Sequence, residues 1–556
     1  MRRLLSVMVF VILGAVPSQG RVLVVDDDGP ADFRTIQAAI DAANDADVIL
    51  VKPGRYIGPG NRDIDFNGKR ITIRSNDPND GSVVASTIVD CKGSESDPHR
   101  GFYFHGGEDA DSVLEGLTIT NGYIAAFEGF GGGIACTASS PTIRRCTISR
   151  NTVPNGSGGG IYCGMNSAPA IEQCTISENI ASLYGGGIFV GSYSKAGATI
   201  KDCSITANSA GFEGGGVFSS CEQLVITGSN VSFNKGGGIL CDWGSGTTIT
   251  ACTFKGNLPF SNNLGGGIVC RGTAIVEHSG IIANTAQSDW FRGSSGGGVT
   301  CSAGNVALTN CLIVGNRSKS GPGRFGEITE GNGGGVCAEA GLVMATNCTI
   351  ADNIADVRGG AIFCGSANIT LGDCIVWNNG PDEIAGPAVI ATFCDVKAAW
   401  PGVGNINADP LFAQIGHWEL NNTPQDVNDD LWIDGDYHLK SQAGRWHEAT
   451  QTWIRDAVTS PCIDGGNPGR RPADEPPPDG NRLNMGAYGG TSQASMSPIG
   501  WRTIADLTND MKVDLRDLDV LVSCWLQAGQ YLPSDLDRNG TVDLQDLTVF
   551  AEHWLP

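Results

Sequence analysis

A glycine-rich motif recurs along the chain, and it restricts the fold more than any other feature. The motif is a glycine triplet, or GGAI in the last copy, and the nine copies start at intervals of 22 to 37 residues. A repeat of this period predicts a solenoid in which each copy forms one coil. The composition agrees, because 79 glycines and only 17% charged residues suit many short turns better than long amphipathic helices. The copies start at Gly131, Gly158, Gly185, Gly214, Gly236, Gly265, Gly296, Gly333 and Gly359.

An asparagine ends a short strand-like run in each coil and forms a second marker. Its distance to the next glycine motif varies from 2 to 17 residues, so each coil contains one variable turn. Asparagine tolerates the left-handed backbone of a tight corner, and stacked asparagine amides can hydrogen-bond from coil to coil. We therefore predict a structural role for Asn121, Asn151, Asn179, Asn208, Asn234, Asn257, Asn284, Asn316, Asn353 and Asn379.

The constant part of each coil shows the alternation of short strands. In GGGIYCGMNSAPAIEQCTISEN, Ile161 and Cys163, then Ile171, then Cys174 and Ile176 alternate with glycine or polar residues. Runs with a period of two, separated by turns, predict three short strands in each coil. Stacked coils would then form three parallel sheets around a narrow apolar interior.

The paired motifs resemble known repeats. GGGI or GGAI followed by IxxN is similar to the repeats of polymorphic outer-membrane proteins, and the array resembles the right-handed parallel β-helix of the pectate-lyase-like superfamily. The resemblance implies an all-β, single-stranded parallel β-helix solenoid over residues 21–380. It also implies that substrate, where there is one, lies against loops from one turn of the coil.

The two ends of the array differ from its middle. In ADFRTIQAAIDAAN, Phe33, Ile36, Ile40 and Ala43 share one helical face, which predicts a helix that caps the first coil. Residues 381–495 lose the repeat. Their segments SPCIDGGNP and RLNMGAYGG resemble the closing segment of "choice-of-anchor" β-helix surface proteins.

The first twenty residues have the pattern of a secretory signal peptide. Arg2 and Arg3 precede an apolar run from Leu4 to Ala15, which is shorter than the ~20 residues of a membrane span. We expect a secreted, extracellular or cell-surface protein without a membrane span in the mature chain. The net charge of −23 argues against nucleic acid as a partner.

Nineteen cysteines leave two interpretations open. In six coils two cysteines lie 10 or 11 residues apart, so each pair could close a disulfide across its coil. Alternatively, the cysteines are buried thiols that stack as small apolar residues. We favour thiols, because Val190 and Ser219 replace the first cysteine in two coils. The pairs are Cys136 with Cys146, Cys163 with Cys174, Cys241 with Cys252, Cys301 with Cys311, Cys337 with Cys348, and Cys364 with Cys374.

Two acidic loops near the end of the chain have the spacing of EF-hand calcium loops. DLTNDMKVDLRD and DLDRNGTVDLQD start 29 residues apart, and an apolar helix is predicted after each. Oxygen ligands at positions 1, 3, 5, 9 and 12 and a carbonyl at position 7 would surround Ca²⁺. The predicted ligands are Asp506, Thr508, Asp510, Lys512, Asp514 and Asp517 in the first loop, and Asp535, Asp537, Asn539, Thr541, Asp543 and Asp546 in the second.

This duplicated unit resembles a type I dockerin over residues 504–556, after a linker at 496–503. The resemblance implies two Ca²⁺ sites and docking to a cohesin-like or other protein. The sequence departs from the family pattern in two ways. Met511 occupies the turn position that Gly540 holds in the second loop, which predicts a weaker first site. Leu515 and Arg516, and Leu544 and Gln545, replace the usual Ser-Thr contact pair, so a cellulosomal cohesin is not implied.

Two further motifs are weaker. DVNDDLWID, Asp426 to Asp434, has loop-like acidic spacing without the turn glycine, and we interpret it as a solvated acidic loop. DPH, with Asp97 and His99, resembles part of the DPHD motif of alginate epimerases. Arg100 replaces its last aspartate, so we predict a contact that stabilises a loop.

No complete catalytic constellation is recognisable, and whether the chain is an enzyme stays open. A lyase would need a cationic base and a hydrolase two opposed carboxylates, for which the weak candidates are Arg292, Arg324, Glu327 and Glu330. The variable turn also carries aromatic residues suited to sugar rings: Tyr184, Phe212, Phe260, Trp290, Phe291 and Phe325. The favoured function is a surface protein that presents loops to polysaccharide or a protein partner. The alternative is an extracellular polysaccharide lyase or glycoside hydrolase.

Overall fold

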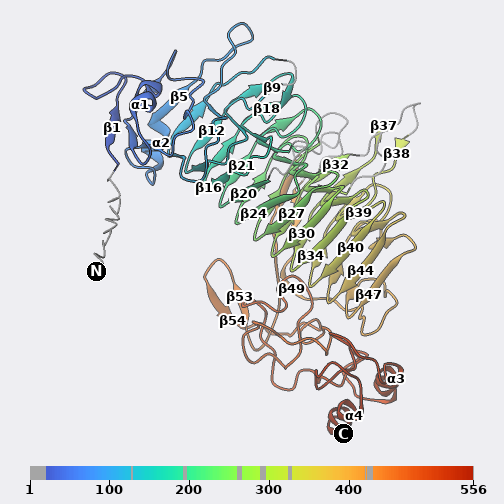
Figure 1. Ribbon diagram of the computed structural model, residues 1–556. Coiled ribbons are helices and arrows are strands. Elements are labelled where there is room, and N and C mark those ends of the chain that lie inside the picture. Colours follow the sequence, from blue (N-terminus) through green and yellow to red (C-terminus); the bar gives the residue numbers. More distant parts are fainter. Residues whose placement is uncertain are drawn as a thin grey trace, which may run out of the picture.

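The computed structural model describes residues 20–126, 129–191, 197–259, 266–287, 296–322, 328–419, 421 and 430–554. Figure 1 shows a long column of stacked coils that starts at the N-terminal end, in blue, and continues to the tan strands near residue 390. The C-terminal part, in orange to red, lies beside the later coils and ends in two short helices.

Three large parallel sheets, named A, B and C here, run along the column. From Phe102 onward each coil contributes one strand to each sheet, and neighbouring strands within the three sheets pair in parallel from coil to coil. The all-β parallel solenoid predicted from the repeats is confirmed.

The strands of the three sheets have the following bounds in the described residues. Sheet A contains β1 (Val22–Val25), β2 (Val48–Val51), β4 (Thr72–Ser75), β7 (Val113–Glu115), β11 (Thr142–Arg144), β16 (Ala170–Glu172), β20 (Gly197–Lys201), β24 (Gln223–Thr227), β27 (Gly246–Thr250), β30 (Thr273–Glu277), β34 (Asn305–Thr309), β40 (Leu342–Thr346), β44 (Asn368–Gly372) and β47 (Val389–Thr392). Sheet B contains β3 (Gly54–Tyr56), β5 (Thr87–Asp90), β8 (Thr118–Thr120), β12 (Thr147–Ser149), β17 (Thr175–Ser177), β21 (Ser204–Thr206), β25 (Asn230–Ser232), β28 (Thr253–Lys255), β31 (Gly280–Ile282), β35 (Leu312–Val314), β41 (Thr349–Ala351), β45 (Ile375–Trp377) and β48 (Asp395–Val396). Sheet C contains β6 (Phe102–Phe104), β10 (Ile134–Thr137), β15 (Ile161–Gly164), β19 (Ile188–Val190), β23 (Val217–Ser219), β26 (Ile239–Cys241), β29 (Ile268–Cys270), β33 (Val299–Cys301), β39 (Val336–Ala338), β43 (Ile362–Cys364) and β46 (Ile384–Ala385).

Smaller strands lie in the turns and in the C-terminal part. Those in the turns are β9 (Gly129–Phe130), β13 (Thr152–Val153), β14 (Gly156–Ser157), β18 (Ile180–Ala181), β22 (Ser209–Ala210), β32 (Thr285–Gln287), β36 (Arg317–Lys319), β37 (Gly321–Pro322), β38 (Ile328–Thr329) and β42 (Ile354–Ala355). Antiparallel pairs past the coils are β49 (Phe412–Gln414) with β52 (Asp436–Leu439), β50 (His417–Glu419) with β51 (Leu431–Ile433), and β53 (Arg445–His447) with β54 (Thr452–Ile454).

The interior is a continuous apolar core built from identical positions of successive coils. Ile143 of β11 stacks in register on Ile171 of β16 and Ile200 of β20, and all three are fully buried. Equivalent isoleucine columns line the inner faces of sheets B and C. Burial of about 25 cal/mol for each Å² of apolar surface makes these columns the main stabilising term of the column.

The asparagines form a hydrogen-bonded ladder, but they are not the left-handed residues of the corner. Asn208 donates from its backbone N and its Nδ2 to Oδ1 of Asn234, at 2.9 and 3.1 Å, and the same pair of bonds links each asparagine from Asn151 to Asn379 with the next. The positive φ falls one residue earlier, as at Ala207 (55°) and Phe233 (55°). The prediction that asparagine takes the left-handed backbone was therefore wrong for the ladder.

Asn121 lies one residue before the ladder position. It has a φ of 57°, and Gly122, not Asn121, donates to Oδ1 of Asn151. The Nδ2 of Asn121 instead donates to Asp90. At the other end of the ladder, Nδ2 of Asn379 donates to Oε2 of Glu383 at 2.6 Å.

All nineteen cysteines are free thiols, eighteen of them buried. One column on sheet C pairs Cys136 with Cys163, and further along Cys241 with Cys270 and Cys301. The next position of this column is occupied by Ala338 and not by Cys337. The register therefore corrects the proposed pair of Cys337 with Cys348. The arrangement agrees with stacked thiols and not with a disulfide in each coil.

The second cysteine column has a polar role that the sequence did not reveal. The residues of this column lie just after the turn from sheet A to sheet B. The thiol or hydroxyl of each residue accepts the backbone N–H of the residue at the same position in the preceding coil. Cys203 N donates to Ser229 Oγ at 3.1 Å, and Cys252 N donates to Ser279 Oγ at 3.0 Å. Serine and cysteine exchange here because both accept one N–H and donate to the carbonyl two residues earlier.

Helix α1 (Ile36–Ala42) caps the first coil, as predicted. Ile36, Ala39 and Ile40 are buried in the core, and Thr35 caps the N-terminus of the helix. A second short helix, α2 (Gly81–Ser86), precedes β5. At the far end the sheets extend to β47 and β48, about one coil past the predicted boundary at residue 380.

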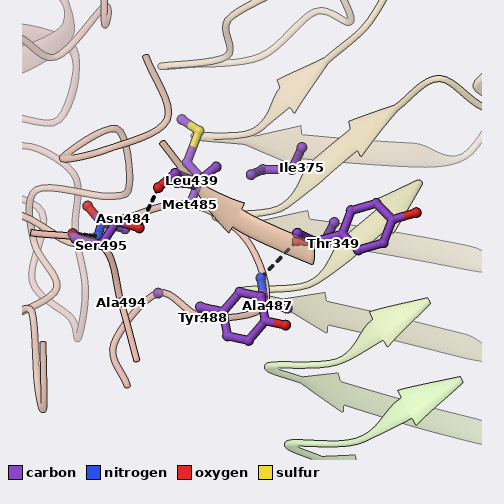
Figure 2. Close-up of a pocket in the computed structure, with 11 residues that line it drawn as sticks. Thr349, Ile375, Leu439, Asn484, Met485, Ala487, Tyr488, Ala494 and Ser495 are labelled. Carbon is purple, nitrogen blue, oxygen red and sulfur yellow. Dashed lines mark hydrogen bonds between the residues drawn. The ribbon is translucent and has the colours of Figure 1, made fainter. Parts of the chain in front are cut away.

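The closing segment, residues 397–500, covers the outer face of sheet B over the later coils. Outward-facing Val314, Ala351 and Ile375 are buried against Phe412, Tyr437 and Met485. Figure 2 shows this junction, where Ala487 N donates to Thr349 Oγ1 around a cavity of about 10 Å³. The cavity has room for no more than one water molecule, so it is a packing detail and not a binding site.

Helices α3 (Leu515–Ser523) and α4 (Leu544–Glu552) form the C-terminal module, which is packed tightly onto the closing segment. Arg482 is fully buried and donates to the carbonyls of Thr503 and Asp506 and to Oδ1 of Asn509. Asn509 in turn donates to the carbonyls of Gly404 and Gly465. Residues 496–503, predicted as a linker, include the buried Arg502 and thus lie within this contact.

Candidate functional site

An aromatic stripe lies on the outer face of sheet C. We use this name for Tyr103, Tyr162, Phe189 and Phe218 of sheet C, together with Phe130 of β9, whose ring contacts Tyr103 and Tyr162 from the turn before β10. The rings of Tyr162 and Phe189 are 5.0 Å apart and nearly parallel, and those of Phe189 and Phe218 are 4.8 Å apart. They stack because outward positions of successive strands stand in register. Tyr162 and Phe189 stay partly exposed, so the stripe gives this face a continuous apolar ridge.

Two of the aromatic residues predicted from the variable turn extend this stripe. Tyr184 packs on Phe218 at 4.7 Å and on Phe212 at 5.7 Å, and Phe212 is largely exposed. Phe260, Trp290, Phe291 and Phe325 lie outside the described residues.

An ion-pair cluster closes the stripe at its C-terminal side. Arg271 forms two bonds to Glu213, at 2.7 and 2.9 Å, and a third to Asp242 at 3.2 Å. Next to Phe218, the outward residues Leu240 and Val269 are buried. Phe218 is itself buried, so the accessible part of the stripe extends from Tyr103 to Phe189.

The opposite end of the stripe carries the DPH motif. His99 contacts Asp63 through Nδ1 and Asp97 through Nε2, the latter at 2.9 Å. The guanidinium of Arg100 lies 4.7 Å from the centre of the Tyr103 ring and 5.1 Å from that of Phe130. Both ring nitrogens of His99 are engaged by carboxylates, which agrees with a contact that stabilises the loop.

Of the four weak catalytic candidates, Glu330 lies in the described part of the chain. Arg292, Arg324 and Glu327 lie outside the described residues. Glu330 pairs with Arg358 at 2.9 Å and accepts a bond from Asn332. These contacts, of which the bond from Asn332 is the largest cause, lower the pKa of Glu330. A carboxyl held ionised in this way suits a surface ion pair better than a general acid.

The second acidic loop gathers three carboxylates. Ligand oxygens of Asp535, Asp537 and Asp546 lie within 4.8 Å of one another. The loop closes because Asp535 accepts the N–H groups of Asn539 and Gly540, and Gly540 has a φ of 93°. Asp543 caps α4 through a capping box with Asp546, so the predicted ligands at positions 1, 3 and 12 converge. Asn539 Oδ1 accepts the N–H of Thr541.

The first acidic loop repeats this backbone arrangement with different surroundings. Asp506 accepts the N–H groups of Asp510 and Met511, and Asp517 accepts those of Thr508 and Asp514. Met511 has a φ of 68°, so a side chain stands where the turn favours glycine.

Cations already approach two of the carboxylates of the first loop. Asp510 pairs with Arg516 at 3.2 Å, and Asp506 lies 3.5 Å from buried Arg502. Lys512 N donates to Asp510 Oδ1. The donor set of the second loop therefore fits Ca²⁺ better than that of the first.

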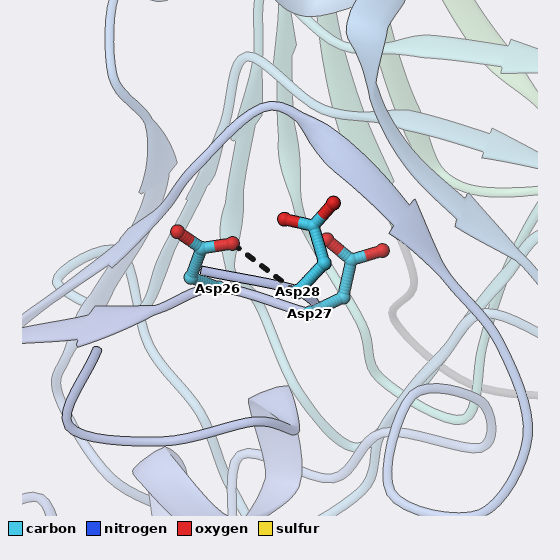
Figure 3. A group of neighbouring side chains, drawn as sticks. All are labelled: Asp26, Asp27 and Asp28. Carbon is cyan, nitrogen blue, oxygen red and sulfur yellow. Dashed lines mark hydrogen bonds between the residues drawn. The ribbon is translucent and has the colours of Figure 1, made fainter. Parts of the chain in front are cut away.

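Other acidic motifs have structural partners. Asp430 of DVNDDLWID is buried against Arg317 at 2.6 Å, and Asp434 pairs with Lys255, so this segment is not simply solvated; Asp426 and Asn428 lie outside the described residues. Figure 3 shows Asp26, Asp27 and Asp28 together in the turn after β1. There Asp26 accepts the N–H of Gly29 and Asp27 that of Arg55, which accounts for both as loop contacts.

Sequence reasoning missed most of the stripe. Tyr162 and Phe189 stand in the constant strand after the glycine triplet, whereas the predicted aromatic residues belong to the variable turn. The available signal was the recurrence of an aromatic residue two positions after the last glycine of the triplet, in IYC, IFV and VFS.

Comparisons with known proteins gave two family matches and a similar solved structure. Residues 66–254 and 179–323 match the family described as "right handed beta helix region", and residues 399–466 match the family described as "disaggregatase related". The crystal structure of pectate lyase Pel9A is similar at 13% sequence identity, with 85% of this chain and 96% of that chain covered and a TM-score of 0.34. No curated protein sequence matches the chain. The repeats of this chain are those of a right-handed parallel β-helix.

Proposed function

We propose that this chain is a secreted or cell-surface protein whose β-helix presents its outer face to polysaccharide or a protein partner. A calcium-dependent C-terminal module docks it to a second protein. Among the described residues, no helix has both the length and the hydrophobicity needed to cross a bilayer.

The proposal that the C-terminal module docks in a calcium-dependent way rests on the donor set of the second acidic loop. Three carboxylates converge, and the chain turns sharply at Gly540. Hard oxygen ligands in a flexible loop are what Ca²⁺ prefers, and Asp546 fixes the start of α4 to the same loop. Bound Ca²⁺ would neutralise carboxylates that otherwise repel one another and so would stabilise the helix that follows.

The surface available for docking is apolar at equivalent points of both helices. Leu515 and Leu544, the first residues of α3 and α4, are 70% and 68% exposed. A partner that recognises this pair must present apolar side chains, in agreement with the departure from the Ser-Thr pattern of cellulosomal dockerins.

The display half is supported by the aromatic stripe. Its ring edges form an apolar ridge, and apolar C–H faces of sugars pack against aromatic surfaces of this kind. The carboxylates closest to its covered end, Glu213 and Asp242, are held by Arg271, so neither is free to act as an acid or base. Binding is therefore a better use of this face than hydrolysis.

The calcium half is tested on the full chain by thermal unfolding in Ca²⁺ and in chelator. We expect Ca²⁺ at a hundred times its Kd to stabilise the folded chain by about 2.7 kcal/mol. Asp546→Asn should abolish most of this gain, whereas Asp519→Asn, at an exposed position of α3 that is not a predicted ligand, should preserve it. Equal unfolding temperatures in Ca²⁺ and chelator would refute the docking half.

A further inference from the structure

An open cleft lies on the outer face of sheet B over the first coils, whereas the closing segment packs on this sheet over the later coils. Its volume is about 410 Å³, and we name it the sheet B cleft. Helix α2 contributes Ala85 to one wall, and β12 contributes Thr147 and Ser149 to the floor. Arg55 and Arg150 also line the cleft, and no carboxylate does so among the described residues. In a chain with a net charge of −23, such a lining favours an anionic ligand.

Arg55 retains a free edge although it is paired. Its Nε and Nη2 donate to the same oxygen of Asp90, at 2.9 and 2.7 Å, and these two bonds occupy one edge of the guanidinium. Asp90 is itself buried and also accepts a bond from Asn121, so it fixes the arginine in place. The other edge consists of Nη1 and the second N–H of Nη2, and it donates to no described residue. This parallel pair of donors matches the two oxygens of a carboxylate, and the Arg55 side chain is 58% exposed.

Arg150 lies toward the other end of the cleft, directly after β12. Its Nε is 3.9 Å from Oε2 of Glu178, beyond hydrogen-bond reach, and its guanidinium donates to no described residue. The strands β3, with Arg55, and β12 are three steps apart in sheet B, which corresponds to about 14 Å. A ligand that contacts both arginines must therefore be longer than a single small anion.

The floor between the arginines offers hydroxyl groups. Oγ1 of Thr120 is buried, and it has no hydrogen-bond partner among the described residues. Ser149 stands beside Thr120 in register, as Thr147 does beside Thr118. A buried hydroxyl without a partner is costly, so a ligand that is itself rich in hydroxyls would offset this cost.

We propose that the sheet B cleft binds an acidic oligosaccharide, with carboxylates at Arg55 and Arg150 and sugar hydroxyls on the floor between them. The described lining contains no aromatic ring on which a neutral pyranose could stack, so charge must supply much of the affinity. The site is separate from the aromatic stripe, which lies on sheet C. Only the choice of a glycan as the ligand rests on the proposed function.

The experiment measures the binding of trigalacturonate to the full chain by titration calorimetry. The buffer contains no added Ca²⁺, because Ca²⁺ itself binds carboxylates. The methyl ester of the same trisaccharide is the matched ligand, since it lacks only the negative charges. We expect the acid to bind at least about tenfold more tightly than the ester, because hydrogen bonds to charged groups are stronger than neutral ones. Arg150→Gln should remove most of this preference, and Arg455→Gln, at an exposed position outside the cleft, should preserve it.

Two further variants separate this site from misfolding and from the aromatic stripe. Arg55→Lys keeps a cation beside Asp90 but lacks the planar fork. We expect it to weaken binding of the acid about threefold or more and to unfold near the temperature of the wild type. The double variant Tyr162→Ala, Phe189→Ala removes rings of the stripe and should leave the preference for the acid unchanged.

Four outcomes would each overturn the proposal. They are equal affinity for acid and ester, an unchanged preference in Arg150→Gln, loss of the preference in the stripe variant, and binding of monomeric galacturonate as tight as that of the trimer. The stripe is tested by its own double variant, so failure of display through the stripe is distinguishable from failure of this site.

Discussion

Single residues decide how the two acidic loops differ. Both loops turn through the left-handed region at their sixth position, where glycine has no steric cost and other residues are strained. Gly540 meets this requirement, and Met511 does not. Because Met511 is 49% exposed, its side chain contributes little packing to offset the strain.

Met511→Gly should therefore improve the first loop, and Gly540→Ala should damage the second. We expect changes of about 1 kcal/mol in opposite directions in the free energy of unfolding of the C-terminal module. Denaturant unfolding monitored by tryptophan fluorescence measures both. Stabilisation by Gly540→Ala would contradict the assignment of this turn.

A buried carboxyl group makes the stability of the closing segment depend on pH. Burial raises the pKa of Glu475 to about 8, and its Oε1 accepts the N–H groups of Asn484 and Gly490. The folded chain thus retains a proton that the unfolded chain releases at lower pH. The stability contributed by this group is full below the unfolded pKa and is lost as the pH rises toward 8.

Glu475→Gln should flatten this dependence, because glutamine has the same shape and does not titrate. We predict that the unfolding temperature of the wild type falls more steeply than that of Glu475→Gln between about pH 5 and pH 8. The exposed control Glu222→Gln should follow the wild type. Parallel curves for all three proteins would show that Glu475 does not titrate as described.

At the scale of elements, the coil is held by two hydrogen-bonded ladders as well as by its apolar core. The asparagine ladder follows sheet B, and the cysteine and serine ladder follows sheet A. Both satisfy backbone N–H groups that a corner would otherwise leave unpaired in the interior. The thiols of the second ladder are engaged in these contacts, and so a disulfide is not needed to hold the coil.

Thiol counting tests this view of the coil. We predict about nineteen reactive thiols in the denatured, unreduced protein, in agreement with the nineteen free cysteines of the structure. A colorimetric thiol assay with and without prior reduction gives the number directly. A count that rises by twelve after reduction would instead indicate the six disulfides of the alternative interpretation.

How much the sequence predicts depends on whether a feature is local and periodic. The strands, the interior isoleucines and the cap at Ile36 follow from spacing, which geometry translates directly into stacked coils. Arg482 is buried against Asn509, which lies 27 residues later in the sequence. Neither residue belongs to the coil repeat, so no sequence pattern predicts their contact. The aromatic stripe could have been predicted from the sequence, but only by aligning outward positions such as Tyr162 and Phe189 across coils.

The whole molecule is a column with its C-terminal module packed against one side. The closing segment covers sheet B, and the module is anchored to that segment through buried Arg482 and Arg502. Docking through the module would therefore orient the entire column, and the face of sheet C that carries the stripe would be presented in a fixed direction (Figure 1).

The most direct test of display without catalysis is incubation of the full chain with insoluble and soluble polysaccharides, both polyuronates and neutral glycans. We predict retention on at least one of them, reduced about tenfold in the double variant Tyr162→Ala, Phe189→Ala. Phe233→Ala, which removes an exposed ring from a turn beside sheet B, should bind as the wild type does. We expect no new reducing or 4,5-unsaturated ends after incubation, and their accumulation with enzymatic turnover would contradict display without catalysis.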